Sequence, residues 1–132
     1  MFAFGYRDVL HNASTTQEIP WLFEISEMNP FTFNVVINTR TAQQKGIRDM
    51  DTIYIENEVG QRIKVKVHTV EGIHPQCIAM AHGSSHWLKG HPAEGKSGLL
   101  NALLRVEDKY FCPISQAIET AVRVKIYKEK DK

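Results

Sequence analysis

The chain has 132 residues, of which 42% are hydrophobic and 23% are charged, and its formal net charge is +1. A chain of this length is expected to form a single domain over residues 1–132 and to bury roughly two-thirds of its unfolded surface without a disulfide or a metal. The near balance of 16 basic and 15 acidic residues argues against a non-specific nucleic-acid binder. No apolar run is long enough to predict a membrane span, and the first residues do not resemble a signal peptide.

The first segment that could carry chemistry is the polar loop of residues 11–17, HNASTTQ. Its hydroxyl and amide groups suit a polyanionic ligand, and Arg7 or His11 could add positive charge. Such loops more often cap a helix, and Pro20 fits the first turn of a short helix that follows. Composition alone favours the capping role, so both interpretations stay open.

A β-branched and aromatic run predicts a strand over residues 31–38. Asn38 or Thr39 can cap a short helical segment over residues 40–45, and Gly46 can end it.

Strict alternation of polar and apolar residues predicts strands over residues 52–56 and 62–68. The residues between them supply turn chemistry, with Gly60 available for a positive φ, so the two strands form a hairpin. Residues 77–81 and 121–127 are expected to be further strands. Many short strands with few helical turns are typical of a mainly β protein that closes into a small barrel.

Residues 82–98 are rich in glycine and histidine and poor in aliphatic side chains, which predicts a long irregular loop. Residues 99–104 could be a strand or a helical turn. Cys77 and Cys112 form no CxxC pair and are expected to be buried or half-buried thiols.

His82 and His86 are spaced i, i+4, but Gly83 follows His82 where a zinc protease needs glutamate, and no third ligand is placed by spacing. No metal site is therefore expected. A glycine beside His82 would let backbone amides approach a flat heterocycle or a phosphate. An alternative is self-cleavage between Gly83 and Ser84, which produces the pyruvoyl group of some small barrel decarboxylases, although a lone Gly-Ser pair is a weak signal.

Five stretches, taken in order, together resemble the C-terminal domain of the molybdopterin oxidoreductases, the dimethyl sulfoxide reductase family. The stretches are Arg7 with the 11–17 loop and Pro20-Trp21-Leu22, residues 36–51, residues 72–83, Asn101-Ala102-Leu103-Leu104, and residues 112–124. The resemblance covers roughly residues 6–126. Three positions depart from the family pattern: Met50 replaces a turn glycine, Cys112 replaces an aspartate, and Glu119 lies near the place of a lysine.

This resemblance implies a double-psi β-barrel with short helices that binds a molybdopterin guanine dinucleotide. In the whole enzyme two such groups hold molybdenum or tungsten, and the protein ligand of the metal lies in other domains. The implied cofactor-binding residues are Arg7, His11, Ser14, Thr15, Thr16, Gln17, His82, Gly83 and Asn101.

No catalytic residue is assigned, and the chain alone is not expected to be active. Its implied partners are the remaining domains or the catalytic subunit of a parent oxidoreductase. Three alternatives stay open: a stand-alone small subunit like that of a formylmethanofuran dehydrogenase, a pyruvoyl-type decarboxylase on the same barrel, and a plain interaction domain whose ligand site has decayed.

Overall fold

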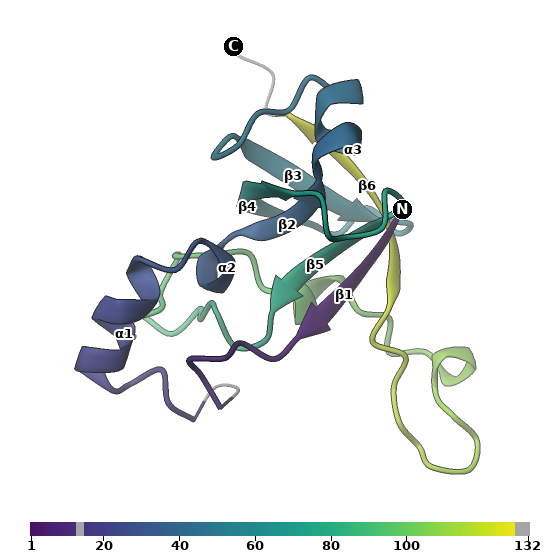
Figure 1. The fold of residues 1–132 in the computed structure, drawn as a ribbon. Coiled ribbons are helices and arrows are strands. Elements are labelled where there is room, and N and C mark those ends of the chain that lie inside the picture. The colour runs from purple at the N-terminus through teal and green to yellow at the C-terminus, as the bar shows by residue number, and fades with distance from the viewer. Residues whose placement is uncertain (13–14, 129–132) are drawn as a thin grey trace.

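The computed structural model describes residues 1–12 and 15–128, which form a six-stranded barrel (Figure 1). The strands are β1 (Phe2–Tyr6), β2 (Val35–Asn38), β3 (Thr52–Asn57), β4 (Arg62–Val70), β5 (Cys77–Ala81) and β6 (Val122–Lys128). They close in the order β1-β5-β2-β4-β3-β6. The helices are short: α1 (Pro20–Glu27), α2 (Pro30–Phe33), α3 (Thr39–Gln44) and two 3₁₀ turns, η1 (Leu100–Leu103) and η2 (Asp108–Tyr110).

Two of the strand pairings are parallel, β1 with β5 and β2 with β4, and the other pairings are antiparallel. This closed barrel with few short helices is the mainly β architecture that the strand pattern predicted, and it agrees with the double-psi barrel that the family resemblance implies. No helix among the described residues is long and apolar enough to cross a membrane.

The alternation read from the sequence sets the inner and outer faces of the barrel. Along β4, Ile63, Val65 and Val67 are buried while the residues between them are exposed. β3 pairs with β4 through the hairpin, and its Ile53 and Ile55 are fully buried in the same core. A one-residue slip would turn every one of these side chains outward, so the core fixes the register.

The prediction of a strand over residues 31–38 is half wrong, because Pro30–Phe33 forms α2 and the strand begins at Val35. The Asn29 side chain caps this turn by accepting a hydrogen bond from the Phe31 amide at 3.1 Å. A proline at the first helical position is pre-organised for a helix, and this local signal outweighed the β-branched and aromatic composition.

The predicted turns are confirmed at three positions. Asn38 caps α3 by accepting from the Arg40 amide at 3.0 Å, and Gly46 ends it with a φ of 65°. Gly60 has a φ of 86° in the β3–β4 hairpin. Met50, which stands where the family pattern has a turn glycine, adopts a left-handed backbone with a φ of 62°.

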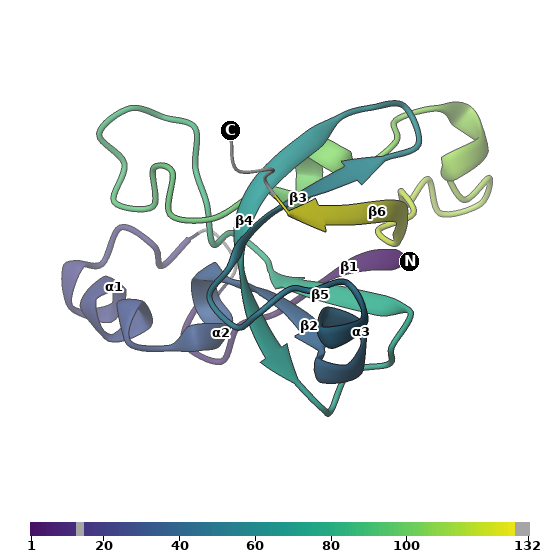
Figure 2. The same ribbon diagram turned by 90° about the horizontal axis from the view of Figure 1, so that it is seen from above.

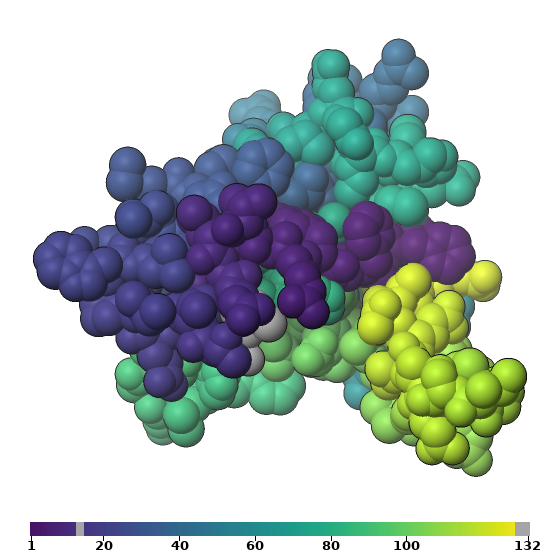
Figure 3. All heavy atoms as spheres, turned by 60° about the horizontal axis from the view of Figure 1, so that its bottom comes forward, coloured from purple at the N-terminus to yellow at the C-terminus, as the bar shows by residue number. Residues whose placement is uncertain are grey.

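The loops gather at two ends of the barrel. α1 and the 82–98 loop project from one end (Figures 1 and 2), where Lys96 pairs with Glu27 at 2.6 Å. Residues 105–121 stand out as a separate lobe in the space-filling view (Figure 3). Cys77 is half-buried as expected, but Cys112 is exposed because it lies in this lobe, so that part of the prediction is wrong.

Candidate binding site

A cavity of about 550 Å³ opens beside the ends of β1 and β5, and three separate segments form its wall. The lining residues are Arg7, Ala81, His82, Gly83, Ser84, Ser85, His86, Trp87, Gly98, Leu99, Leu100 and Asn101. Four of the residues expected to bind a cofactor, Arg7, His82, Gly83 and Asn101, therefore share one surface.

Parallel pairing of β1 with β5 explains why Arg7 and His82 meet. Tyr6 pairs with Ala81 at the last register position, so the next residue of each strand leaves the sheet at the same edge. The His82 amide donates to the Tyr6 carbonyl at 2.8 Å, and this hydrogen bond holds the ends of β1 and β5 together.

Gly5 makes room for the His82 side chain. A Cβ built on Gly5 would collide with the His82 imidazole ring. The φ of Gly5 is not left-handed, so the need for glycine at this position comes from the ring and not from the backbone. The ring therefore lies directly on β1.

Asn101 reaches the cavity from η1, and Asn57 at the end of β3 anchors this turn. The buried Asn57 amide donates to the Leu103 carbonyl at 2.9 Å and to Gln61 Oε1 at 2.8 Å. Asn57 Oδ1 also accepts from the amides of Val59 and Gln61, so one side chain ties the hairpin turn to η1.

The polar ends of Arg7, His82 and Asn101 are available to a ligand. Among the residues that the structure describes, no side-chain hydrogen bond or ion pair involves any of the three. A guanidinium group offers paired donors to phosphate oxygens, and an amide offers both a donor and an acceptor.

The hydroxyl groups of the two serines in the cavity wall form hydrogen bonds within the protein. Ser84 Oγ donates to the Ala81 carbonyl at 2.9 Å, and Ser85 Oγ donates to the Ser97 carbonyl at 2.5 Å. Both serines are almost completely buried. Gly83 adopts a φ of 75°, so the tight turn after β5 needs a residue without a Cβ.

The described residues of the first polar loop, 11, 12 and 15–17, are at the same end of the barrel but do not line this cavity. The ring of the buried His11 bonds through Nδ1 to Thr16 Oγ1 at 3.1 Å and through Nε2 to Ser26 Oγ of α1 at 2.6 Å. Thr15 is exposed, and its hydroxyl donates to the Asn12 carbonyl at 2.7 Å. These bonds hold the loop against α1. They do not cap the helix: its N-cap residue is Ile19, and no side-chain hydrogen bond caps it there among the described residues, so the capping role that composition favoured is not found.

Gln17 and Ser14 complete the expected set. Gln17 is only 2% exposed, and its buried Oε1 has no hydrogen-bond partner among the described residues. It is absent from the cavity wall. Ser14 lies outside the described residues.

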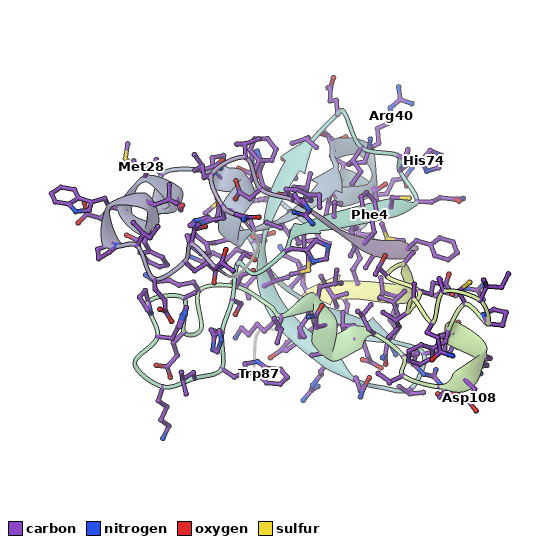
Figure 4. The ribbon with its side chains drawn as sticks, turned by 90° about the horizontal axis from the view of Figure 1, so that it is seen from below. Phe4, Met28, Arg40, His74, Trp87 and Asp108 are labelled. Atoms are coloured by element: carbon purple, nitrogen blue, oxygen red, sulfur yellow. The ribbon has the colours of Figure 1, made fainter. Side chains whose placement is uncertain are left out.

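The sequence reasoning did not assign Ser85, Trp87 or Leu99 to a binding site, although they line the cavity, and it treated His86 only as an unsupported metal ligand. Trp87 is 71% exposed, and Figure 4 shows it at the opposite end of the molecule from Arg40 and His74. An exposed tryptophan in a glycine-rich loop is a signal that could have marked this wall.

Tyr6 stiffens the strand end beside the cavity. Its hydroxyl donates to the Phe31 carbonyl at 2.5 Å. Burial and the nearby Asp8 carboxylate raise the pKa of Tyr6 to about 12, so the phenol keeps its proton and this bond at neutral pH.

Two other features bear on the chemistry. Among residues 1–12 and 15–128, no group of three or more histidine, cysteine, aspartate or glutamate side chains could hold a metal. A second cavity of about 250 Å³ lies beside the 105–121 lobe, where Glu58 and Glu119 stand next to two arginines. These carboxylates make that cavity a poor match for a phosphate group.

The profile of the family described as "Molydopterin dinucleotide binding domain" matches residues 3–122 of the chain. The chain belongs to this family. The match spans most of the barrel, from β1 to the first residue of β6, and includes all of the cavity described above.

The known proteins similar to this domain include two that are much longer than it. The arsenate respiratory reductase molybdopterin-containing subunit ArrA of Shewanella sp. (strain ANA-3) is 28% identical over 94 residues, which cover 68% of this chain and 11% of that protein. The structure of acetylene hydratase from Pelobacter acetylenicus superposes with a TM-score of 0.77 at 18% identity, covering 97% of this chain and 18% of that one. This chain thus spans a small part of each. Neither the small-subunit alternative nor the decarboxylase alternative is favoured by these matches.

The residues of the cavity fit a pterin dinucleotide. Its volume lies within the range of small-molecule sites. An adjoining cavity of about 490 Å³ shares Trp87 and Leu99 with it and is lined by the basic side chains of Arg62, Lys66 and Lys96. A long ligand with a flat ring at one end and charged phosphates along its length matches this pair of cavities.

Proposed function

We propose that this domain holds the molybdopterin guanine dinucleotide of a larger molybdenum or tungsten oxidoreductase, in the cavity beside the ends of β1 and β5. The observation that carries the proposal is the convergence of Arg7, His82 and Asn101 from three segments, each with an unused polar side chain. A ligand with several acceptor groups needs donors that converge in this way.

The residues have separate roles in this proposal. Arg7 neutralises the pyrophosphate, since a guanidinium group pairs with two phosphate oxygens at once. The Asn101 side chain forms hydrogen bonds with the edge of the pterin, through its NH₂ group as a donor and its carbonyl oxygen as an acceptor. Gly83 lets the chain turn close to the ligand. The His82 ring packs on Gly5 and forms part of the cavity wall. The bound group supplies the redox-active metal and its two-electron chemistry, and the domain supplies binding and orientation.

We propose that the whole chain acts as one domain and that the catalytic reaction belongs to a larger parent protein. The apolar face of α1 supports this partner: Trp21 and Ile25 of the helix and its C-cap residue Met28 are 78%, 53% and 85% exposed. Exposed apolar groups of this size on one helix are typical of a contact surface. The other domains of the parent oxidoreductase are the occupant that we assign to it.

Binding of the air-oxidised, metal-free dinucleotide, whose pterin ring is fluorescent, tests the proposal on the 132-residue chain. Arg7→Gln and Asn101→Ala should each weaken binding about 10-fold or more, because a hydrogen bond to a charged group contributes about 1.5–3 kcal/mol. Arg40→Gln is the matched control, because Arg40 is exposed on α3 at the opposite end of the molecule (Figure 4).

Equal binding by all of these variants would contradict the proposed site. Binding that is absent from the wild-type chain would contradict the function itself. A chain that contains one molybdenum or tungsten per molecule after purification would show that no larger parent is needed to hold the metal.

A further inference from the structure

The 82–98 loop closes on itself around His86 and His91. The His86 amide donates to the Ala93 carbonyl at 3.2 Å, and the Gly90 amide donates to the Glu94 carboxylate at 2.8 Å. Ala93 is fully buried, so this small ring of residues is fixed to the body of the protein.

The two imidazole rings are stacked on each other. Their centroids lie 4.3 Å apart with an angle of 18° between the ring planes. The His91 side chain is only 7% exposed, and its Nε2 lies 3.8 Å from Glu18 Oε1. His91 is therefore a buried support, while His86 lies on the wall of the cavity.

Backbone hydrogen bonds fix the tautomer of both rings. The Leu88 amide donates to His86 Nδ1 at 3.0 Å, and the Ala93 amide donates to His91 Nδ1 at 3.1 Å. A nitrogen that accepts a hydrogen bond carries no proton, so each neutral ring has its proton on Nε2. His86 thus has one polar atom left, an N–H donor.

We infer that His86 is a further ligand-binding residue of this cavity, where it donates its Nε2–H to an acceptor of the dinucleotide, and that His91 is its positioning residue. This inference rests on the proposed function and adds a residue that the sequence did not assign to the cofactor. The acceptor is either a phosphate oxygen or a carbonyl or ring nitrogen of the pterin, since both present lone pairs to an N–H group.

His74 provides a matched control within the chain. Its Nδ1 also accepts from the amide two residues later, that of Gln76, at 3.2 Å. His74 is exposed and lies at the opposite end of the molecule from Trp87 (Figure 4). It shares the local geometry of His86 without lining the cavity.

The test is a nuclear magnetic resonance titration of the ¹⁵N-labelled chain, in which long-range couplings identify which ring nitrogen carries the proton. Guanosine 5′-diphosphate and pterin-6-carboxylate are added in separate experiments, so that the two arms distinguish a phosphate acceptor from a pterin acceptor. We expect the Nε2–H tautomer for His86 and His91, and a shift of the His86 Nε2 signal in one arm while the His74 signals stay unchanged.

Variants distinguish the loss of the His86 Nε2–H donor from a loss of the loop's structure. His86→Asn keeps an acceptor for the Leu88 amide and removes the Nε2 donor. The affinity for the probe that shifts the His86 Nε2 signal should therefore fall about 10-fold. His86→Gln places an amide donor near the former Nε2 and should recover part of this loss. His91→Phe keeps the stacked ring but removes the acceptor for the Ala93 amide, and should weaken binding by loosening His86. His74→Asn should have no effect.

The outcomes separate this inference from the proposed function. If the probes shift the signals of Arg7 and Asn101 but leave His86 unchanged, or if His86 carries its proton on Nδ1, the inference is overturned and the proposed function stands. If no probe moves the signals of any of the three residues, both are overturned. These wild-type measurements decide the matter even if a variant fails to fold.

Discussion

The contact between Gly5 and the His82 ring makes a specific prediction about the stability of the site. An alanine at position 5 would place its Cβ inside the ring, so the ring must leave its position or β1 must shift. Overpacking of this kind costs about 1–3 kcal/mol of unfolding free energy. Gly5 itself has no left-handed φ, so a strand alanine without this collision would be favourable by about 0.5–1 kcal/mol.

A double-mutant cycle isolates the collision. We expect Gly5→Ala to lower the free energy of unfolding in the wild-type chain and to leave it unchanged or raise it in a His82→Ala background, with a coupling of about 2 kcal/mol. Urea denaturation of the four proteins measures the effect. The Gly5→Ala chain should also bind the dinucleotide more weakly, because His82 is displaced from the cavity wall.

Additivity would refute this reasoning. If Gly5→Ala has the same effect in both backgrounds to within about 0.5 kcal/mol, the His82 ring does not lie on Gly5.

Three further predictions concern other parts of the chain. Hydrogen bonds from the Ser115 hydroxyl and from two backbone amides lower the pKa of Cys112 to about 7, so its alkylation by iodoacetamide should reach half its maximal rate near pH 7; a midpoint near pH 9 would contradict this. Asn57→Ala should lower the free energy of unfolding by about 2–3 kcal/mol in urea, because the buried Leu103 carbonyl loses its donor; a loss under 0.5 kcal/mol would show that Asn57 does not anchor η1. Met50→Gly should raise the unfolding free energy by about 0.5–1 kcal/mol, since it relieves a left-handed φ, and a decrease would argue against that conformation.

The barrel strands that the sequence predicted are those with an alternating pattern or a compact apolar run. Residues 62–68 alternate without a break because one face of β4 packs in the core. β1 was missed because Phe2–Tyr6 is short and has no clear alternation, and its place depends on pairing with β5, about 75 residues away in the chain. Local patterns carry no information on such a distant parallel partner.

The site could be predicted only in part. His82 and Gly83 stood out by composition, but only the family resemblance placed Arg7 in the same site, because its approach to His82 follows from the pairing of two distant parallel strands. In the first polar loop, His11 uses both ring nitrogens for hydrogen bonds within the protein, a role that the loop's composition did not separate from ligand binding. Residue type alone does not distinguish a side chain that is available to a ligand from one that forms hydrogen bonds within the protein.

Amide signals of the ¹⁵N-labelled chain, followed during addition of the air-oxidised dinucleotide, test the central claim most directly. If the cavity beside β1 and β5 holds the cofactor, the shifts should gather at Arg7, residues 82–87 and residues 98–101, which line it. Shifts confined to the 105–121 lobe and its smaller cavity, or no shifts at a saturating concentration, would contradict the claim.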